Sequence, residues 1–223
     1  MQKAFVLLSG GIDSSTCLHL ANRDFESVTA ISIDYGQRHY KEIMAACEVA
    51  ETLGCSHETL TLAQQPRSML TDPDSKIPDA SYDDLGYGKS PTYHPFRNGQ
   101  LLSYITSYAI AHLSEADKGG VYFGAHAEDA HNFAYADCTP EFIGAMANAI
   151  YIGTYHKVRL HTPLMSLMKA EIVTLGARLG VPFELTWSCY AGGELHCGTC
   201  PTCRARRDAF NQAHTEDPTE YAA

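Results

Sequence analysis

The chain has 223 residues, of which 45% are apolar and 19% charged, and its formal net charge is −10. These values exclude a disordered chain and fit one domain with a sizeable core. An acidic surface repels phosphates, which argues against a nucleic acid partner, and no apolar run approaches the length of a membrane span.

The first third of the sequence predicts alternating strands and helices. Apolar and β-rich runs predict strands at residues 4–8, 28–34 and 57–62. Runs rich in helix formers predict helices between them, at 14–21 and 41–53. Strands that alternate with helices form a parallel sheet with crossover helices on both faces, so we expect an α/β, Rossmann-like fold.

Residues 63–91 interrupt this alternation. The segment contains four prolines with aspartates and glycines between them, which predicts a long irregular loop of a kind that often carries function. Beyond it we expect a strand at 121–124 and helices at 99–113, 140–153, 166–179 and 201–213. We predict a single domain over residues 1–213, followed by a polar, frayed tail over residues 214–223.

The loop after the first predicted strand, here named the phosphate loop, reads Ser9-Gly10-Gly11-Ile12-Asp13-Ser14-Ser15. Paired glycines let the backbone turn tightly and approach an anion, and the N–H groups at the start of the following helix then point at it. The loop lacks the lysine of a Walker A motif. An ordinary strand-to-helix turn capped by serines is the alternative, and the position directly after the first apolar strand favours phosphate binding.

The pattern Ser-Gly-Gly-x-Asp-Ser resembles the PP-loop of N-type ATP pyrophosphatases. The resemblance implies that this loop holds the β,γ-pyrophosphate of ATP and that Asp13 lies near the phosphates through a magnesium ion. The ATP-binding residues that it implies are Leu8, Ser9, Gly10, Gly11, Ile12, Asp13, Ser14 and Ser15. Asp34, Gln37 and His39 lie at the carboxyl end of the second strand, where open α/β sheets bind ligands, so we expect ATP contacts there too.

Four of the eight cysteines are clustered in the last fifth of the chain: Cys189, Cys197, Cys200 and Cys203. A disulfide framework would spread its cysteines over a small secreted domain, whereas this close spacing suits one tetrahedral metal ion. Four thiolates leave no open position for a substrate, so we expect a structural zinc in a knuckle over residues 189–203. An iron–sulfur cluster and a redox-active cysteine pair are the alternatives.

The order of the remaining motifs makes the resemblance more specific. They are Asp34-Tyr-Gly-Gln-Arg-His39, Pro95-Phe-Arg-Asn98, Tyr135-Ala-Asp-Cys138, Thr162-Pro-Leu164 with Lys169 and Glu171, and Thr186-Trp-Ser-Cys-Tyr190 before the cysteine cluster. From Phe5 to Phe210 this series resembles the 7-cyano-7-deazaguanine synthase family of queuosine biosynthesis. That family implies a five-stranded sheet of the adenine nucleotide alpha hydrolase-like type with a C-terminal zinc knuckle and helix.

Membership would imply a carbon–nitrogen ligase that uses ATP, Mg²⁺ and a structural Zn²⁺. Its small-molecule substrates would be 7-carboxy-7-deazaguanine and ammonia, with no direct nucleic acid or membrane partner, and it would act as a homodimer. Met1–Phe5 lacks the layout of a signal peptide, so we expect a cytoplasmic enzyme. The alternatives are a tRNA-sulfurating PP-loop enzyme and a deazaguanine-processing protein that stops at the amide, conjugates the base to a protein or serves DNA modification.

The expected catalytic residues are Asp13, Lys169 and Arg97. Arg97 and the adjacent Asn98 are assigned to the substrate, although a structural ion pair is the alternative for Arg97. Asp137 either accepts hydrogen bonds from the N–H edge of the base or caps a helix. Lys169 lies early in a predicted helix, where the macrodipole disfavours a cation, so we expect it to contact phosphate; a solvated lysine is the alternative.

Two positions depart from the family pattern, and one group of residues has no expected role. His94 precedes Pro95 where an apolar residue is usual, and Ala136 replaces a proline. Both lie near the expected substrate wall; they indicate either a variant that stops at the amide or a change without consequence. His126, His131, His156 and His161 show no metal-ligand spacing, so we expect them to be solvent or core residues.

Overall fold

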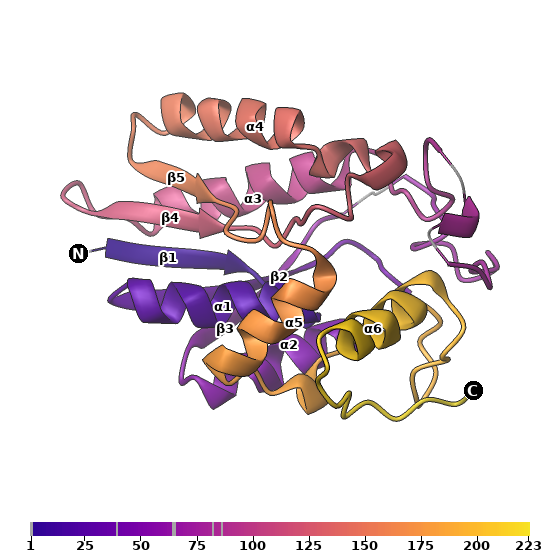
Figure 1. Cartoon of the computed structure of the whole chain (residues 1–223). Coiled ribbons are helices and arrows are strands. Elements are labelled where there is room, and N and C mark those ends of the chain that lie inside the picture. Colours follow the sequence, from indigo (N-terminus) through magenta and orange to yellow (C-terminus); the bar gives the residue numbers. More distant parts are fainter. Residues whose placement is uncertain (1, 39, 64–65, 82, 86) are drawn as a thin grey trace.

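The computed structural model describes the whole chain except residues 1, 39, 64–65, 82 and 86. The described residues form five parallel strands in one sheet (Figure 1): β1 (Gln2–Leu7), β2 (Ser27–Asp34), β3 (Ser56–Thr61), β4 (Lys118–Tyr122) and β5 (Val158–His161). Their order across the sheet is β3-β2-β1-β4-β5. The expected parallel α/β sheet is confirmed.

Helices cover both faces of the sheet. They are α1 (Ile12–Asp24), α2 (Lys41–Thr52), α3 (Arg97–Ala111), α4 (Pro140–Gly153), α5 (Lys169–Leu179) and α6 (Pro201–Gln212). Short 3-10 turns lie at Asp83–Leu85, His131–Phe133, Ala136–Cys138 and Phe183–Leu185. The helices α1, α2 and α5 pack on one face, and α3 and α4 pack on the other (Figure 1). No helix in the described part of the chain is long and apolar enough to span a membrane.

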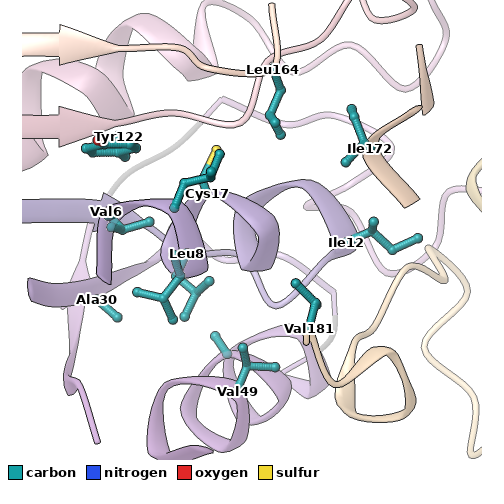
Figure 2. Close-up of a cluster of buried hydrophobic side chains, with 14 of the residues drawn as sticks. Val6, Leu8, Ile12, Cys17, Ala30, Val49, Tyr122, Leu164, Ile172 and Val181 are labelled. Carbon is teal, nitrogen blue, oxygen red and sulfur yellow. The ribbon is translucent and has the colours of Figure 1, made fainter. Parts of the chain in front are cut away.

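The side chains of β1 alternate between two hydrophobic clusters because successive residues of a strand point to opposite faces. Ala4 and Val6 belong to the cluster beneath α1 and α2, and Phe5 and Leu7 belong to the cluster beneath α3 and α4. Figure 2 shows the first cluster, with side chains from β1, α1, α2 and α5 that include Val6, Ile12, Cys17, Val49 and Ile172. This packing fixes the start of α1 against the centre of the sheet.

The strand order creates a crevice at the carboxyl ends of the central strands β1 and β4. The chain leaves β1 through α1 on one face and leaves β4 toward α4 on the other face. The connections that follow these two neighbouring strands therefore diverge, and open α/β sheets bind ligands outside the carboxyl ends of such strands. The phosphate loop follows β1, so it lies at this point.

Two strands were only partly predicted. We expected a strand at 121–124, but β4 begins at Lys118. The prediction missed its start because Gly119 and Gly120 give a weak strand signal in the sequence. These glycines are required by packing: a Cβ at Gly120 would lie 2.9 Å from the ring of His161. We assigned no element to residues 159–163, most of which belong to β5, a strand of four residues.

Two helices also begin at other residues than expected. The predicted helix at 99–113 begins at Arg97, directly after Phe96, whose φ of 53° is left-handed and ends the preceding turn. The predicted helix at 166–179 begins at Lys169, because the residues before it form a turn closed by Leu167 N–H and the Leu164 carbonyl oxygen. Both shifts place a cation in the first turn of a helix.

The expectation of a frayed tail is wrong. Asp217 forms an ion pair of 3.1 Å with Arg206, which is fully buried in α6, and also accepts a 2.6 Å hydrogen bond from the Tyr221 hydroxyl. The Ala222 N–H donates to the carbonyl oxygen of His196 within the knuckle. A buried guanidinium needs an anionic partner, and the tail supplies it.

Candidate active site

A cavity of about 540 Å³ opens where the connections after β1 and β4 diverge. Its walls come from the phosphate loop, the carboxyl end of β2, the connection after β4, the first turns of α2, α3 and α5, and the segment that contains Trp187, Ser188 and Tyr190. Segments far apart in the sequence therefore meet around one space. A cleft of this size at the carboxyl edge of a parallel sheet is the expected place for a ligand.

The phosphate loop is held in shape by its own serines. The Ser9 N–H donates to Ser14 Oγ at 3.1 Å, and the Ser14 hydroxyl donates to the Gly11 carbonyl oxygen at 3.2 Å. Gly10 has a φ of 78°, and a Cβ there would lie 2.4 Å from the Glu42 carbonyl oxygen, so only glycine fits. The N-cap residue of α1 is Gly11, which has no side chain to cap the helix, so the first-turn N–H groups suit an anion.

Asp13 and Lys169 form an ion pair beside this loop. Asp13 lies in the first turn of α1, and Lys169 is the first residue of α5. Burial raises the pKa of the Asp13 carboxyl, but the Lys169 ammonium and then His126 outweigh burial and hold this pKa below its ordinary value. Asp13 Oδ1 is buried and has no hydrogen-bond partner among the described residues. An ionised carboxylate with one unused oxygen thus lies at the cavity.

His126 joins this pair, a position that we did not predict. The side chain is buried, and its Nε2 atom lies 3.8 Å from Asp13 Oδ2, 3.5 Å from Asp129 Oδ1 and 3.5 Å from Lys169 Nζ. His126 follows β4 at the same edge of the sheet as the phosphate loop. Its place shortly after the predicted strand at 121–124 was the signal that could have identified it.

The connection after β4 also fixes the start of α5. The Lys169 N–H donates to Glu128 Oε1 at 2.7 Å, which supplies an acceptor for one of the unpaired N–H groups of the first helical turn. Gly124 lets this connection approach the phosphate loop, since a Cβ there would lie 3.2 Å from Ser14 N. Asp13 is therefore positioned by the phosphate loop and Lys169 by the connection after β4, and these two segments contact each other.

Arg97 lines the cavity from the start of α3. It is the first residue of α3, and its Nη1 donates to the Tyr35 hydroxyl at 3.4 Å. Its Nε donates to Asn98 Oδ1 at 3.3 Å. No carboxylate in the described part of the chain forms an ion pair with Arg97. Its positive charge thus remains available to a ligand in the cavity, which Arg97 lines.

Asn98 and Asp137 contact each other. Asp137 Oδ2 accepts the Asn98 N–H at 3.0 Å, so Asp137 satisfies an N–H group in the first turn of α3. The Asn98 side chain donates to Cys138 Sγ at 3.1 Å. Asn98 lines the cavity, whereas Asp137 is buried and is not among the residues that line it.

The expected ATP-binding residues divide into two groups. Those that line the cavity are Leu8, Ser9, Gly11, Ile12, Asp13, Ser14 and Gln37. Gly10, Ser15 and Asp34 do not line it, and the Asp34 carboxylate accepts the Gly36 N–H at 2.9 Å within its own turn. His39 lies outside the described residues. His94 and Ala136, the two departures from the family pattern, are also absent from the cavity lining.

The four clustered cysteines are arranged as a metal site. Their sulfur atoms all lie within 4.8 Å of one another, and Cys197 Sγ and Cys203 Sγ are 3.9 Å apart. A tetrahedral ion with metal–sulfur bonds of about 2.3 Å places its sulfurs about 3.8 Å apart. Backbone N–H groups of Ala191 and Cys197 donate to Cys189 Sγ at 3.3 Å, which suits a thiolate. The residues therefore fit one closed tetrahedral ion.

The fold and the site define a PP-loop enzyme of the adenine nucleotide alpha hydrolase-like class: a five-stranded parallel sheet with the phosphate loop after its first strand. The family described as "Queuosine biosynthesis protein QueC" matches residues 3–214. The chain belongs to this family.

Curated relatives agree with this assignment. A 7-cyano-7-deazaguanine synthase of Nostoc sp. is 41% identical, over 99% of this chain and 97% of its own length. The synthase of Nostoc punctiforme is 41% identical, over 99% of this chain and 100% of its own length. The synthase of Thermoplasma acidophilum is also 41% identical, over 99% of this chain and 92% of its own length. These matches include every element that lines the cavity.

Proposed function

We infer that this chain is a 7-cyano-7-deazaguanine synthase, a carbon–nitrogen ligase that converts 7-carboxy-7-deazaguanine and ammonia to 7-cyano-7-deazaguanine with ATP. The observation that carries this proposal is the Asp13–Lys169 pair beside the phosphate loop, within a chain that matches the family over residues 3–214. The relatives that bear this name match along nearly the whole chain.

The chemistry explains why a phosphate site lies beside the substrate cavity. A carboxylate is a poor electrophile, so its oxygen first attacks the α-phosphorus of ATP and pyrophosphate leaves. Ammonia then attacks the acyl carbon, AMP leaves and a proton is lost, which gives the amide. In the second round the amide oxygen is adenylated, and loss of AMP and the nitrogen-bound protons gives the nitrile. Both rounds release pyrophosphate, so one phosphate site serves both.

In this proposal Lys169 and the N–H groups of the phosphate loop stabilise the negative charge that develops on the leaving pyrophosphate. Asp13 orients the Lys169 ammonium through their ion pair. Arg97 pairs with the substrate carboxylate or with a phosphate, because it faces the cavity without an ion-pair partner in the described chain. Asn98 contributes to the same wall. No side chain acts as a nucleophile.

Two metals fit the residues. Asp13 Oδ1 is an unused anionic oxygen beside the phosphate loop, which suits Mg²⁺, an ion that proteins often bind through one carboxylate and substrate phosphates. When bound, Mg²⁺ would offset charge on the phosphates of ATP. The four cysteines suit a structural Zn²⁺ within a single domain over residues 1–213. We further propose a homodimer, which sedimentation equilibrium can test.

The test is to supply the purified chain with 7-carboxy-7-deazaguanine, ammonium, magnesium and ATP. The proposal predicts a product with the mass of the nitrile, formed without tRNA or a protein acceptor. Product that stops at the amide would support the variant reading of His94 and Ala136. Neither residue lines the cavity, so we expect the nitrile.

A further inference from the structure

Glu42 places a carboxylate in the cavity that the proposed mechanism does not use. It is the second residue of α2, is half-buried, and lines the same space as Tyr35, Arg97 and Tyr190. No hydrogen bond or ion pair joins its carboxylate to any residue in the described ranges of the chain. A carboxyl group in such a place either keeps a proton or needs hydrogen-bond donors, because an ionised carboxylate without donors costs free energy.

Glu42 and Arg97 act on each other without touching. Burial raises the pKa of Glu42 to about 7, and the positive charge of Arg97 opposes this rise. However, no ion pair within 4.0 Å joins the two side chains; the Arg97 Nη1 donates instead to the Tyr35 hydroxyl. A buried charge without a partner is costly, so each of the two side chains favours a ligand group of opposite character. Two such side chains that line one cavity without forming an ion pair suit a ligand that carries N–H donors at one end and an anion at the other.

The substrate of the proposed reaction has this character. Its aminopyrimidinone edge presents a ring N–H and an exocyclic amino group side by side, and its carboxylate projects from the five-membered ring. We considered Asp137 for the N–H edge, but Asp137 Oδ2 accepts the Asn98 N–H and the residue does not line the cavity. Glu42 is a carboxylate that does face this space.

We propose that Glu42 is the specificity-determining residue for the base, and that its two oxygens accept hydrogen bonds from the ring N–H and the exocyclic amino group. This inference rests on the proposed function. Two adjacent donors match the two oxygens of a carboxylate. An adenine edge offers a ring nitrogen acceptor at the corresponding position, and a carboxylate repels it. Glu42 thereby separates the guanine-like substrate from the adenine of ATP, which must enter the same cavity.

The test compares two bases on three proteins. The bases are 7-carboxy-7-deazaguanine and its analogue without the exocyclic amino group. The proteins are the wild type, Glu42→Gln and Glu48→Gln, which removes an exposed carboxylate from the same helix. Steady-state kinetics gives kcat/KM for each base and KM for ATP, and equilibrium dialysis without ATP gives Kd for each base independently of turnover.

We expect Glu42→Gln to lower kcat/KM for the natural base by about 10- to 100-fold, as for the loss of hydrogen bonds to a charged group. KM for ATP should stay within about two-fold of the wild type. The preference for the natural base over the analogue should shrink by about ten-fold or more in the variant, in both kcat/KM and Kd. Glu48→Gln should match the wild type throughout.

Equal losses for both bases in Glu42→Gln, or a change in KM for ATP alone, would overturn the proposal, because a structural role acts on every ligand alike. The proposed function fails in a different way. If the wild type binds the natural base with the expected preference but does not convert it, the synthase assignment falls and the role of Glu42 stands. If the wild type binds neither base, both fall.

Discussion

Trp187 donates its backbone N–H to the carbonyl oxygen of Gly10 at 2.8 Å, so the segment before the cysteine knuckle is bonded to the phosphate loop. The knuckle holds this segment in turn: the Ser188 N–H donates to His196 Nε2 at 3.0 Å, and the rings of Trp187 and His196 have centroids 4.2 Å apart. The cysteine knuckle therefore supports the phosphate loop through Trp187 and Ser188.

The first prediction concerns this support. Purified protein should contain one zinc per chain, and the double variant Cys200→Ala Cys203→Ala should lose it and melt about 10 °C lower or more, because metal binding is coupled to folding. KM for ATP should rise as well, since the Trp187–Gly10 hydrogen bond depends on the knuckle. Elemental analysis measures the zinc content, thermal melts measure the stability, and steady-state kinetics measures KM for ATP. Cys47→Ala, outside the cluster, is the control. Iron with a visible absorption band, or zinc retained by the double variant, would contradict a structural zinc at these four cysteines.

A second prediction concerns the ion pair at the phosphate loop. Asp13→Asn should lower ATP turnover by about 10²-fold or more, because the variant loses the charge that orients Lys169 and the oxygen that suits Mg²⁺. Lys169→Ala should act in the same direction. The losses in the double variant should be far from additive, since the two side chains form one unit. Asp24→Asn, at the far end of α1, is the control. Turnover within a few-fold of wild type would show that Asp13 is only a helix-terminal carboxylate.

The third prediction is a pH dependence of stability. Burial raises the pKa of Glu42 from 4.5 to about 7, so the folded protein holds a proton that the unfolded chain releases between these values. Stability is therefore lost as the pH rises from about 4.5 to about 7. Glu42→Gln should remove this loss and stabilise the protein at pH 8 by about 1–3 kcal/mol, with little effect at pH 5. Thermal melts at both pH values decide; an equal effect at both would contradict the account.

The C-terminal tail gives a fourth prediction. Asp217→Asn should destabilise the protein by about 3 kcal/mol, because it leaves the fully buried Arg206 without its anion. Burial raises the pKa of Asp217, but Arg206 and the Tyr221 hydroxyl hold it below its ordinary value. The contribution should thus be complete above about pH 4 and lost at lower pH. Glu216→Gln, an exposed neighbour, should have no effect on chemical denaturation. A neutral Asp217→Asn would mean that the tail is frayed after all.

Local patterns in the sequence were sufficient for most of the sheet. Strand β1 and the phosphate loop follow from an apolar run and a glycine pair. The cysteine cluster that fits a metal ion follows from cysteine spacing, since both signals lie within a short stretch of chain. Gly119 and Gly120 concealed the start of β4. They fit because a neighbouring ring and a leucine side chain occupy the space of a Cβ, which only the folded chain reveals.

The residues that the sequence did not reveal are those brought together by the fold. His126 is an isolated histidine in the sequence, and only the adjacency of β1 and β4 places it beside Asp13 and Lys169. The need of Arg206 for Asp217 was equally hidden, since both lie in polar stretches that predict an exposed surface. Spacing along the chain cannot show contacts between segments that meet through sheet topology.

If one site activates two oxygens in succession, the ratio of AMP to product must reflect both activations. The chain should be supplied with 7-carboxy-7-deazaguanine, ammonium, magnesium and limiting ATP, with AMP counted and the product weighed. We expect the nitrile with about two AMP per molecule from the acid, and about one from the amide, because each step needs one activated oxygen. AMP that forms only when tRNA or a protein acceptor is added would contradict this expectation.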